Sequence, residues 1–133
     1  MASTSNSRLF DLEEGRELRL DFGKVQSIGQ AVIPVVVQDV ESKTILILAY
    51  VNREALDYSI RYKIATFWST SRNELWVKGK TSGDQLELVE IRVNCEQNSL
   101  LYLVRLMGKN ACHTRRLSCF YRKMDDNTLI HVE

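Results

Sequence analysis

Two apolar, β-branched runs that lie close together constrain the fold of this chain more than any other feature. AVIPVVVQD (31–39) is followed by the polar link VESK and then by TILILAYV (44–51). β-branched residues favour strands, and a short polar connection between two such runs is typical of a hairpin. The one proline, Pro34, lies in the first run and predicts that this strand is at a sheet edge or contains a bulge.

One helix and further strands are expected after this hairpin. Asn52 can cap a helix, and the apolar spacing that follows predicts one over residues 53–62. ATFWSTS and ELWVKGK predict a strand pair around a turn at 71–73, with Gly83 ending the second strand. In QLELVEIRVN the apolar phase shifts at Val89, which predicts a bulge or a strand buried on both faces. SLLYLVRLM and NTLIHV predict two more strands. We therefore expect an α+β, mainly β domain of about seven strands.

Length and charge limit the classes of function. A chain of 133 residues with 44% apolar and 26% charged residues is expected to form one soluble domain. Its net charge of +1 provides no general attraction to nucleic acid or membrane, so a phosphate ligand needs a local basic cluster. Residues 1–20 are expected to be a polar extension, in which 9–20 form a short helix or none. With no signal-like or membrane-spanning segment there, we expect a cytoplasmic protein.

The three cysteines are the first candidates for chemistry. In a reducing compartment an odd number of thiols fits a disulfide framework poorly, whereas three thiolates are a suitable ligand set for a catalytic zinc ion. Sixteen residues separate Cys95 from Cys112, and six separate Cys112 from Cys119. This spacing is unlike that of zinc fingers, so the pattern alone favours structural thiols over metal ligands.

Three other groups of residues leave their alternatives open. His113 is either a general base or a surface histidine, since its ordinary pKa is near neutrality. The segment NCEQNS (94–99) places oxygen-bearing side chains at alternate positions, as a hard-cation site would. A basic, hydroxyl-rich run can bind phosphates, although a solvated hairpin face is the commoner explanation of such a run. Its members are Arg72, Lys78, Lys80, Thr81 and Ser82.

Four blocks in order make the chain resemble the phosphoribosyl-AMP cyclohydrolases, which are enzymes of histidine biosynthesis. The blocks are PVVVQDVESKTILILAYVNREAL, ATFWSTSRNELWVKGKTSGD, VEIRVNCEQNSLLYLV and ACHTRRLSCFYR. The resemblance extends from about Asp21 to Arg122, so we expect residues 21–133 to form the cyclohydrolase domain, in the free-standing, single-domain form.

The resemblance implies a site for each of these groups. Cys95, Cys112 and Cys119 match the family's three zinc ligands, which come from both subunits of an intertwined homodimer with a folded, pseudobarrel-like mixed sheet. One zinc ion per chain is expected, and His113 is expected to move protons. The purine nucleotide is expected to contact Arg116 and the basic run defined above.

Two segments depart from the family pattern. Asn94, Glu96 and Asn98 stand where the family has three aspartates, so the magnesium site that the resemblance implies is expected to be weakened. Arg115 stands where the family commonly has glycine, which predicts a changed loop or pocket.

The expected function is zinc-dependent hydrolytic opening of the purine ring of phosphoribosyl-AMP between N1 and C6. Two alternatives remain open: a divergent zinc hydrolase acting on another purine nucleotide, and a non-catalytic, zinc-stabilised nucleotide-binding module. A nucleic-acid-binding β domain is a third class, which the near-zero net charge opposes. We therefore expect a homodimer with a small-molecule substrate and with no nucleic-acid or membrane partner.

Overall fold

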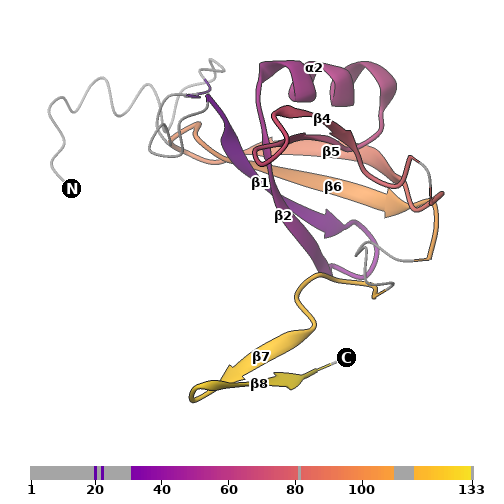
Figure 1. Cartoon of the computed structure of the whole chain (residues 1–133). Helices are drawn as coiled ribbons and strands as arrows, with labels where there is room; N and C mark the ends of the chain where they lie inside the picture. Colours follow the sequence, from indigo (N-terminus) through magenta and orange to yellow (C-terminus); the bar gives the residue numbers. More distant parts are fainter. Residues whose placement is uncertain (1–19, 21, 23–30, 81, 110–115, 133) are drawn as a thin grey trace, which may run out of the picture.

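A mainly β domain with one helix is seen in the computed structural model, which describes residues 20, 22, 31–80, 82–109 and 116–132 (Figure 1). The predicted α+β, mainly β class is confirmed. The expected extension at 1–20 lies outside the described residues, apart from Leu20. In chain order the elements are β1 (Ile33–Asp39), β2 (Ile45–Val51), α2 (Arg53–Tyr62), β3 (Thr66–Ser69), β4 (Glu74–Val77), β5 (Leu86–Val93), β6 (Leu100–Leu106), β7 (Arg122–Asp125) and β8 (Thr128–His131).

Four strands form one mixed sheet in the order β2-β1-β6-β5. β1 is antiparallel to β2 and parallel to β6, whereas β5 and β6 are antiparallel neighbours. β3 pairs with β4 and β7 with β8 in two separate hairpins. The sheet is therefore mixed as predicted, and the described strands do not close into a barrel.

The helix and the β3–β4 hairpin cover one face of this sheet (Figure 1). α2 has the predicted bounds because Asn52 Oδ1 accepts the Ala55 N–H at 2.8 Å, while Lys63 ends the helix in the left-handed region at φ 59°. The core between these layers is apolar and almost fully buried. Its largest members include Tyr102, Phe67, Ile33, Leu46 and Leu86.

Two bulges bend the sheet. Val89 of β5 has no partner in β6, because Leu88 is opposite Val104 and Glu90 is opposite Leu103. The bulge predicted from the apolar phase shift is thereby confirmed. Leu46 of β2 is likewise an extra residue, since Ile47 is opposite Val37 and Ile45 is opposite Gln38.

Of the two alternatives predicted from Pro34, an edge strand or a bulge, the edge strand is wrong, because β1 lies between β2 and β6. The pairing with β6 begins at Val35, one residue after Pro34, so this end of β1 has only β2 as a neighbour. A missing backbone N–H is tolerated there for the same reason that it is tolerated on an edge strand. The bulge in the β1–β2 pair lies at Leu46, away from the proline.

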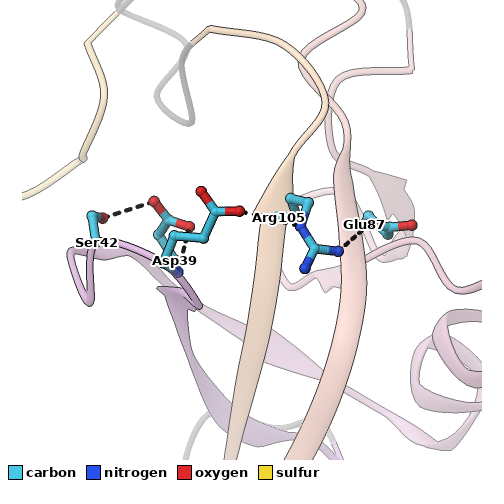
Figure 2. Close-up of polar contacts among 5 residues, drawn as sticks. Asp39, Ser42, Glu87 and Arg105 are labelled. Atoms are coloured by element: carbon cyan, nitrogen blue, oxygen red, sulfur yellow. Dashed lines mark hydrogen bonds and ion pairs between the residues drawn. The ribbon is translucent and has the colours of Figure 1, made fainter.

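The β1–β2 turn is tied to the far side of the sheet by charged side chains (Figure 2). The Asp39 carboxylate accepts Ser42 Oγ–H at 2.7 Å. Burial raises the pKa of Asp39, but the hydrogen bonds from Ser42 and from the turn backbone, together with the charge of Arg105, hold this pKa below its ordinary value. Arg105 Nη1 donates to Glu87 Oε1 at 2.9 Å, and Arg105 Nε lies 3.5 Å from Glu41 Oε1. All of these ion-paired side chains are exposed, so the pairs contribute little to the stability of the fold.

The β7–β8 hairpin stands apart from the sheet (Figure 1). Every residue of both strands is exposed, including Met124 at 79% and Leu129 at 54%. β7 was not predicted from the sequence, because RKMD has no apolar alternation. An isolated two-stranded hairpin is only marginally stable in water, so this hairpin needs a surface to pack on.

No helix in the part of the chain that the structure describes is both long and apolar enough to cross a bilayer.

Candidate metal and nucleotide site

Cys95 lies in the tight turn that joins β5 to β6, and its side chain is exposed. Asn94 N–H donates to Ser99 O at 3.2 Å and Gln97 N–H donates to Asn94 O at 3.0 Å. Gln97 has a φ of 55°, which lets the chain reverse within the turn. The turn therefore presents the Cys95 thiol at one end of the sheet, as a metal ligand must be presented.

The side-chain oxygens of Asn94 and Asn98 and one oxygen of Glu96 accept hydrogen bonds within the turn. Asn94 Oδ1 accepts the N–H groups of Asn98 and Ser99, both at 2.9 Å. Asn94 Nδ2 donates to Asn98 Oδ1 at 2.6 Å, and Asn98 Nδ2 donates to Glu96 Oε2 at 3.2 Å. Magnesium requires several unoccupied oxygens, preferably carboxylates, in octahedral geometry. This donor set does not fit a magnesium ion.

Cys119 is also exposed, and it lies beside the bulge of β2. Its backbone N–H donates to Leu46 O at 2.7 Å, and the buried Ser118 donates its Oγ–H to Ile45 O at 2.6 Å. A bulge leaves backbone groups outside the regular strand ladder, and here they anchor the segment that carries Cys119. The role of Ser118 was not foreseen from the sequence, since a serine before a cysteine has no distinctive pattern.

Cys95 and Cys119 lie far apart in one chain. The turn containing Cys95 adjoins the Val35 end of β1, because Leu100 is opposite Val35, whereas Leu46 is near Val37 on the outer strand β2. Strand spacings of about 4.8 Å and a rise of about 3.3 Å per residue place the two cysteines on the order of 20 Å apart. Thiolates on one zinc ion have sulfurs within about 4 Å of each other. At this separation the two cysteines of one chain do not face a common zinc position in the structure.

Cys112, His113 and Arg115 lie outside the described residues. Within the described ranges there is no cluster of three histidine, cysteine or acidic side chains. Cys95 and Cys119 are, however, chemically suited to zinc, since both are exposed cysteines whose thiolates are strong zinc ligands.

The segment after β6, which precedes Cys112 in the sequence, is anchored by Asp84. Its Oδ1 accepts the Lys109 N–H at 3.2 Å, and the neighbouring Gln85 O accepts the Met107 N–H at 3.0 Å. Gly108 has no room for a side chain, because a Cβ there would lie 2.1 Å from Asp84 Oδ1. Asp84 thus fixes the chain three residues before Cys112. Gly83 in TSGD predicted a strand end but not this contact.

The residues expected to bind substrate divide into three groups in one chain. Arg72 is exposed in the β3–β4 turn, where its N–H donates to Ser69 Oγ at 3.2 Å. Lys78 is buried, while Lys80 and Ser82 are exposed in the loop at the opposite end of β4. The Arg116 guanidinium lies 4.3 Å from the centre of the Tyr121 ring, and Thr81 is outside the described residues. Among the described residues, Arg72 therefore lies at the opposite end of β4 from Lys80 and Ser82.

Two hollows lie near the ends of the sheet. One, of about 410 Å³, adjoins the Cys95 turn and is lined by Val36, Arg92, Asn94 and Leu101, among others. The other, of about 460 Å³, lies at the start of α2 and includes Asn52, Arg53 and Trp68. The first hollow is the one that adjoins a predicted metal ligand.

Comparisons with known proteins identify the family of this chain. Residues 47–121 match the family model described as phosphoribosyl-AMP cyclohydrolase, and this range includes Cys95, Cys112 and Cys119. A phosphoribosyl-AMP cyclohydrolase of Archaeoglobus fulgidus is 49% identical over 72% of this chain and 88% of its own length. Those of Chlorobium chlorochromatii and Hyphomonas neptunium are 41% and 44% identical over 91% and 88% of this chain, and each alignment covers 85% of the relative. The chain belongs to the phosphoribosyl-AMP cyclohydrolase family.

Proposed function

We propose that this protein is a zinc-dependent phosphoribosyl-AMP cyclohydrolase that opens the purine ring between N1 and C6. The observation that carries the proposal is the family match over residues 47–121, which spans all three cysteines and His113. The exposure of Cys95 and Cys119 supports their use as ligands. We place the protein in the cytoplasm, where reduced thiols persist.

The chemistry divides between the ion and the chain. Zinc, when bound, supplies a Lewis acid that lowers the pKa of a water molecule to about 7. The water oxygen joins C6 and becomes the carboxamide oxygen as the N1–C6 bond breaks. Of the two water protons, one ends on N1 and the other on the exocyclic nitrogen, which becomes the amide NH2. His113 accepts the proton from water and returns it during ring opening, since imidazole changes protonation near neutral pH. The phosphate-bearing end of the nucleotide contacts basic side chains such as Lys80 and Arg116.

A homodimer completes the site in this proposal, with Cys95 from one subunit and Cys119 from the other. The separation of about 20 Å in one chain supports this arrangement. So does the exposed β7–β8 hairpin, which begins three residues after Cys119 and is suited to packing on a second subunit. The sheet face opposite α2 also offers an apolar row, in which Val36 is opposite both Leu48 and Leu101, with Leu48 50% exposed.

A turnover assay tests the proposal. Purified protein with a measured zinc content is incubated with phosphoribosyl-AMP, and the ring-opened imidazole carboxamide ribotide is quantified. We expect turnover that disappears, together with bound zinc, in Cys112→Ser, because a serine hydroxyl is a poor zinc ligand. Ser42→Ala, on the β1–β2 turn, is the control and should keep both. Full activity in Cys112→Ser would exclude the three-thiolate site.

The amides at Asn94 and Asn98 favour a second candidate, a zinc hydrolase of the same fold that acts on another purine nucleotide. The same assay separates the two, because absence of product from phosphoribosyl-AMP at every zinc and magnesium concentration would exclude the first proposal. Retention of nucleotide without any conversion would instead indicate a non-catalytic binding module.

A further inference from the structure

The turn that carries Cys95 is closed by its own amide groups. Asn94 Nδ2 donates to Asn98 Oδ1 at 2.6 Å, so an amide N–H group lies between the two side chains. Asn98 Nδ2 extends the chain of hydrogen bonds to Glu96 Oε2 at 3.2 Å. Asn94 and Asn98 therefore use their donors to link the alternate side chains of the turn to one another.

The acceptors of the turn are engaged as well. Asn94 Oδ1 accepts two backbone N–H groups, from Asn98 and Ser99. Asn98 Oδ1 accepts from Asn94, and one oxygen of Glu96 accepts from Asn98. A cation entering this turn would have to displace N–H donors from these oxygens, and it would meet one formal negative charge, that of Glu96. Magnesium gives up its water reluctantly, and such a weak donor set does not compensate for that loss.

We propose that this turn is a metal-free, amide-cross-linked turn, which holds Cys95 in position and binds no magnesium ion. The amide hydrogens take the place between the side-chain oxygens that a divalent cation would otherwise occupy. The inference deepens the proposed function, because it makes the placement of one zinc ligand independent of magnesium. It also requires that any magnesium needed for turnover arrives on the phosphates of the nucleotide.

Magnesium titration of the full, zinc-containing protein tests this directly. Isothermal titration with MgCl2 should give no saturable binding, and about 10 mM Mg²⁺ should leave the unfolding midpoint unchanged, because only a ligand that binds the native state raises it. The double variant Asn94→Asp/Asn98→Asp places two carboxylates where the 2.6 Å contact now lies. We expect its midpoint to fall without magnesium and to recover, saturably, when Mg²⁺ is added.

Asn73→Asp is the control. It adds a carboxylate in the turn of the β3–β4 hairpin, away from the Cys95 turn, so it should show no stabilisation by magnesium. Saturable binding of one Mg²⁺ by the unmodified chain with a Kd below about 1 mM would overturn the inference. So would a folded Asn94→Asp/Asn98→Asp variant that magnesium fails to stabilise.

These measurements are independent of turnover. A protein that binds no magnesium but also converts no phosphoribosyl-AMP would support this inference and contradict the proposed function. A protein that is active and binds magnesium at this turn would support the proposed function and contradict this inference.

Discussion

Tyr102 places a hydroxyl group in the middle of the core. The residue is fully buried, and its ring stacks on Phe67 at a centroid distance of 6.0 Å. The hydroxyl approaches Ser59, but it makes no hydrogen bond with any described residue, since Ser59 Oγ already bonds the backbone of Ala55 and Thr66. Burial raises the pKa of Tyr102 to about 12, which the neighbouring Ser59 partly offsets.

Tyr102 should make the protein sensitive to alkali. Between pH 10 and 12 the unfolded chain loses the phenol proton while the folded chain keeps it, so the free energy of unfolding falls as pH rises. Two pKa units correspond to roughly 3 kcal/mol, reached only above pH 12. Tyr102→Phe removes this contribution and an unsatisfied buried hydroxyl. We expect the variant to match or exceed the parent's stability at pH 7 and to lose less by pH 11.

Denaturant unfolding at several pH values measures the effect. Tyr121→Phe is a suitable control, because Tyr121 lies outside the buried core and should leave the pH dependence unchanged. Parallel curves for Tyr102→Phe and the parent between pH 9 and 11.5 would contradict the assignment.

At the level of elements, the loop between β4 and β5 requires a glycine at position 79, because a side chain there would collide with the backbone of Asp84. Gly79 has a φ of 75°, and a Cβ on it would lie 2.2 Å from the backbone carbon of Asp84. Gly83, in the same loop, has a φ of 84° but open space around it. Both glycines therefore need a positive φ, but only Gly79 is also in close contact with another part of the backbone.

Substitution of the two glycines separates these contributions. Gly83→Ala should cost about 1 kcal/mol, the strain of a left-handed alanine. Gly79→Ala should cost about 2 to 4 kcal/mol, because the Asp84 backbone must also move. Thermal or denaturant unfolding of both variants provides the comparison. Equal losses in the two variants would show that the close contact at Gly79 carries no cost.

Displacement of Asp84 should also affect the proposed zinc site. Since Asp84 anchors Lys109 three residues before Cys112, we expect Gly79→Ala to weaken zinc binding while Gly83→Ala leaves it nearly unchanged. Competition with a zinc chelator measures this difference independently of turnover.

Local patterns predicted most elements correctly. The Asn52 cap and the bounds of α2, the β3–β4 turn and the bulge at Val89 all depend on chemistry within a few residues of sequence. β7 was missed because its four residues lack apolar alternation. Pro34 led to a wrong prediction because proline indicates only that one backbone donor is missing. Strand β6 begins to pair with β1 at Val35, one residue later, so an inner strand tolerates the proline.

The whole molecule decides whether the predicted ligands can meet. Opposite ends of the sheet carry Cys95 and Cys119, and the proposal of a shared site predicts complementation between inactive chains. Cys95→Ser and Cys119→Ser are each expected to lack zinc and activity. In a mixed dimer, however, one of the two sites contains only intact cysteines.

Unfolding and refolding the two variants together, with zinc, should therefore restore activity. Random pairing makes half of the dimers mixed, with one of two sites intact, so about a quarter of the unmodified activity is expected. Each variant refolded alone is the control and should stay inactive. Absence of recovery, with mixed dimers demonstrated by mass spectrometry, would contradict a zinc site shared between subunits.

The sequence by itself determined the mainly β class, the helix, most strands, the three cysteines and the family, because these depend on local periodicity and on motifs read in order. Tertiary structure alone decided that β1 is an inner strand, that Asp84 anchors the approach to Cys112, and that Cys95 and Cys119 lie at opposite ends of the sheet. It also decided that the amides of Asn94 and Asn98 bond one another. The physical reason is that strand order, register and side-chain orientation arise from contacts between residues distant in sequence, which no local pattern contains.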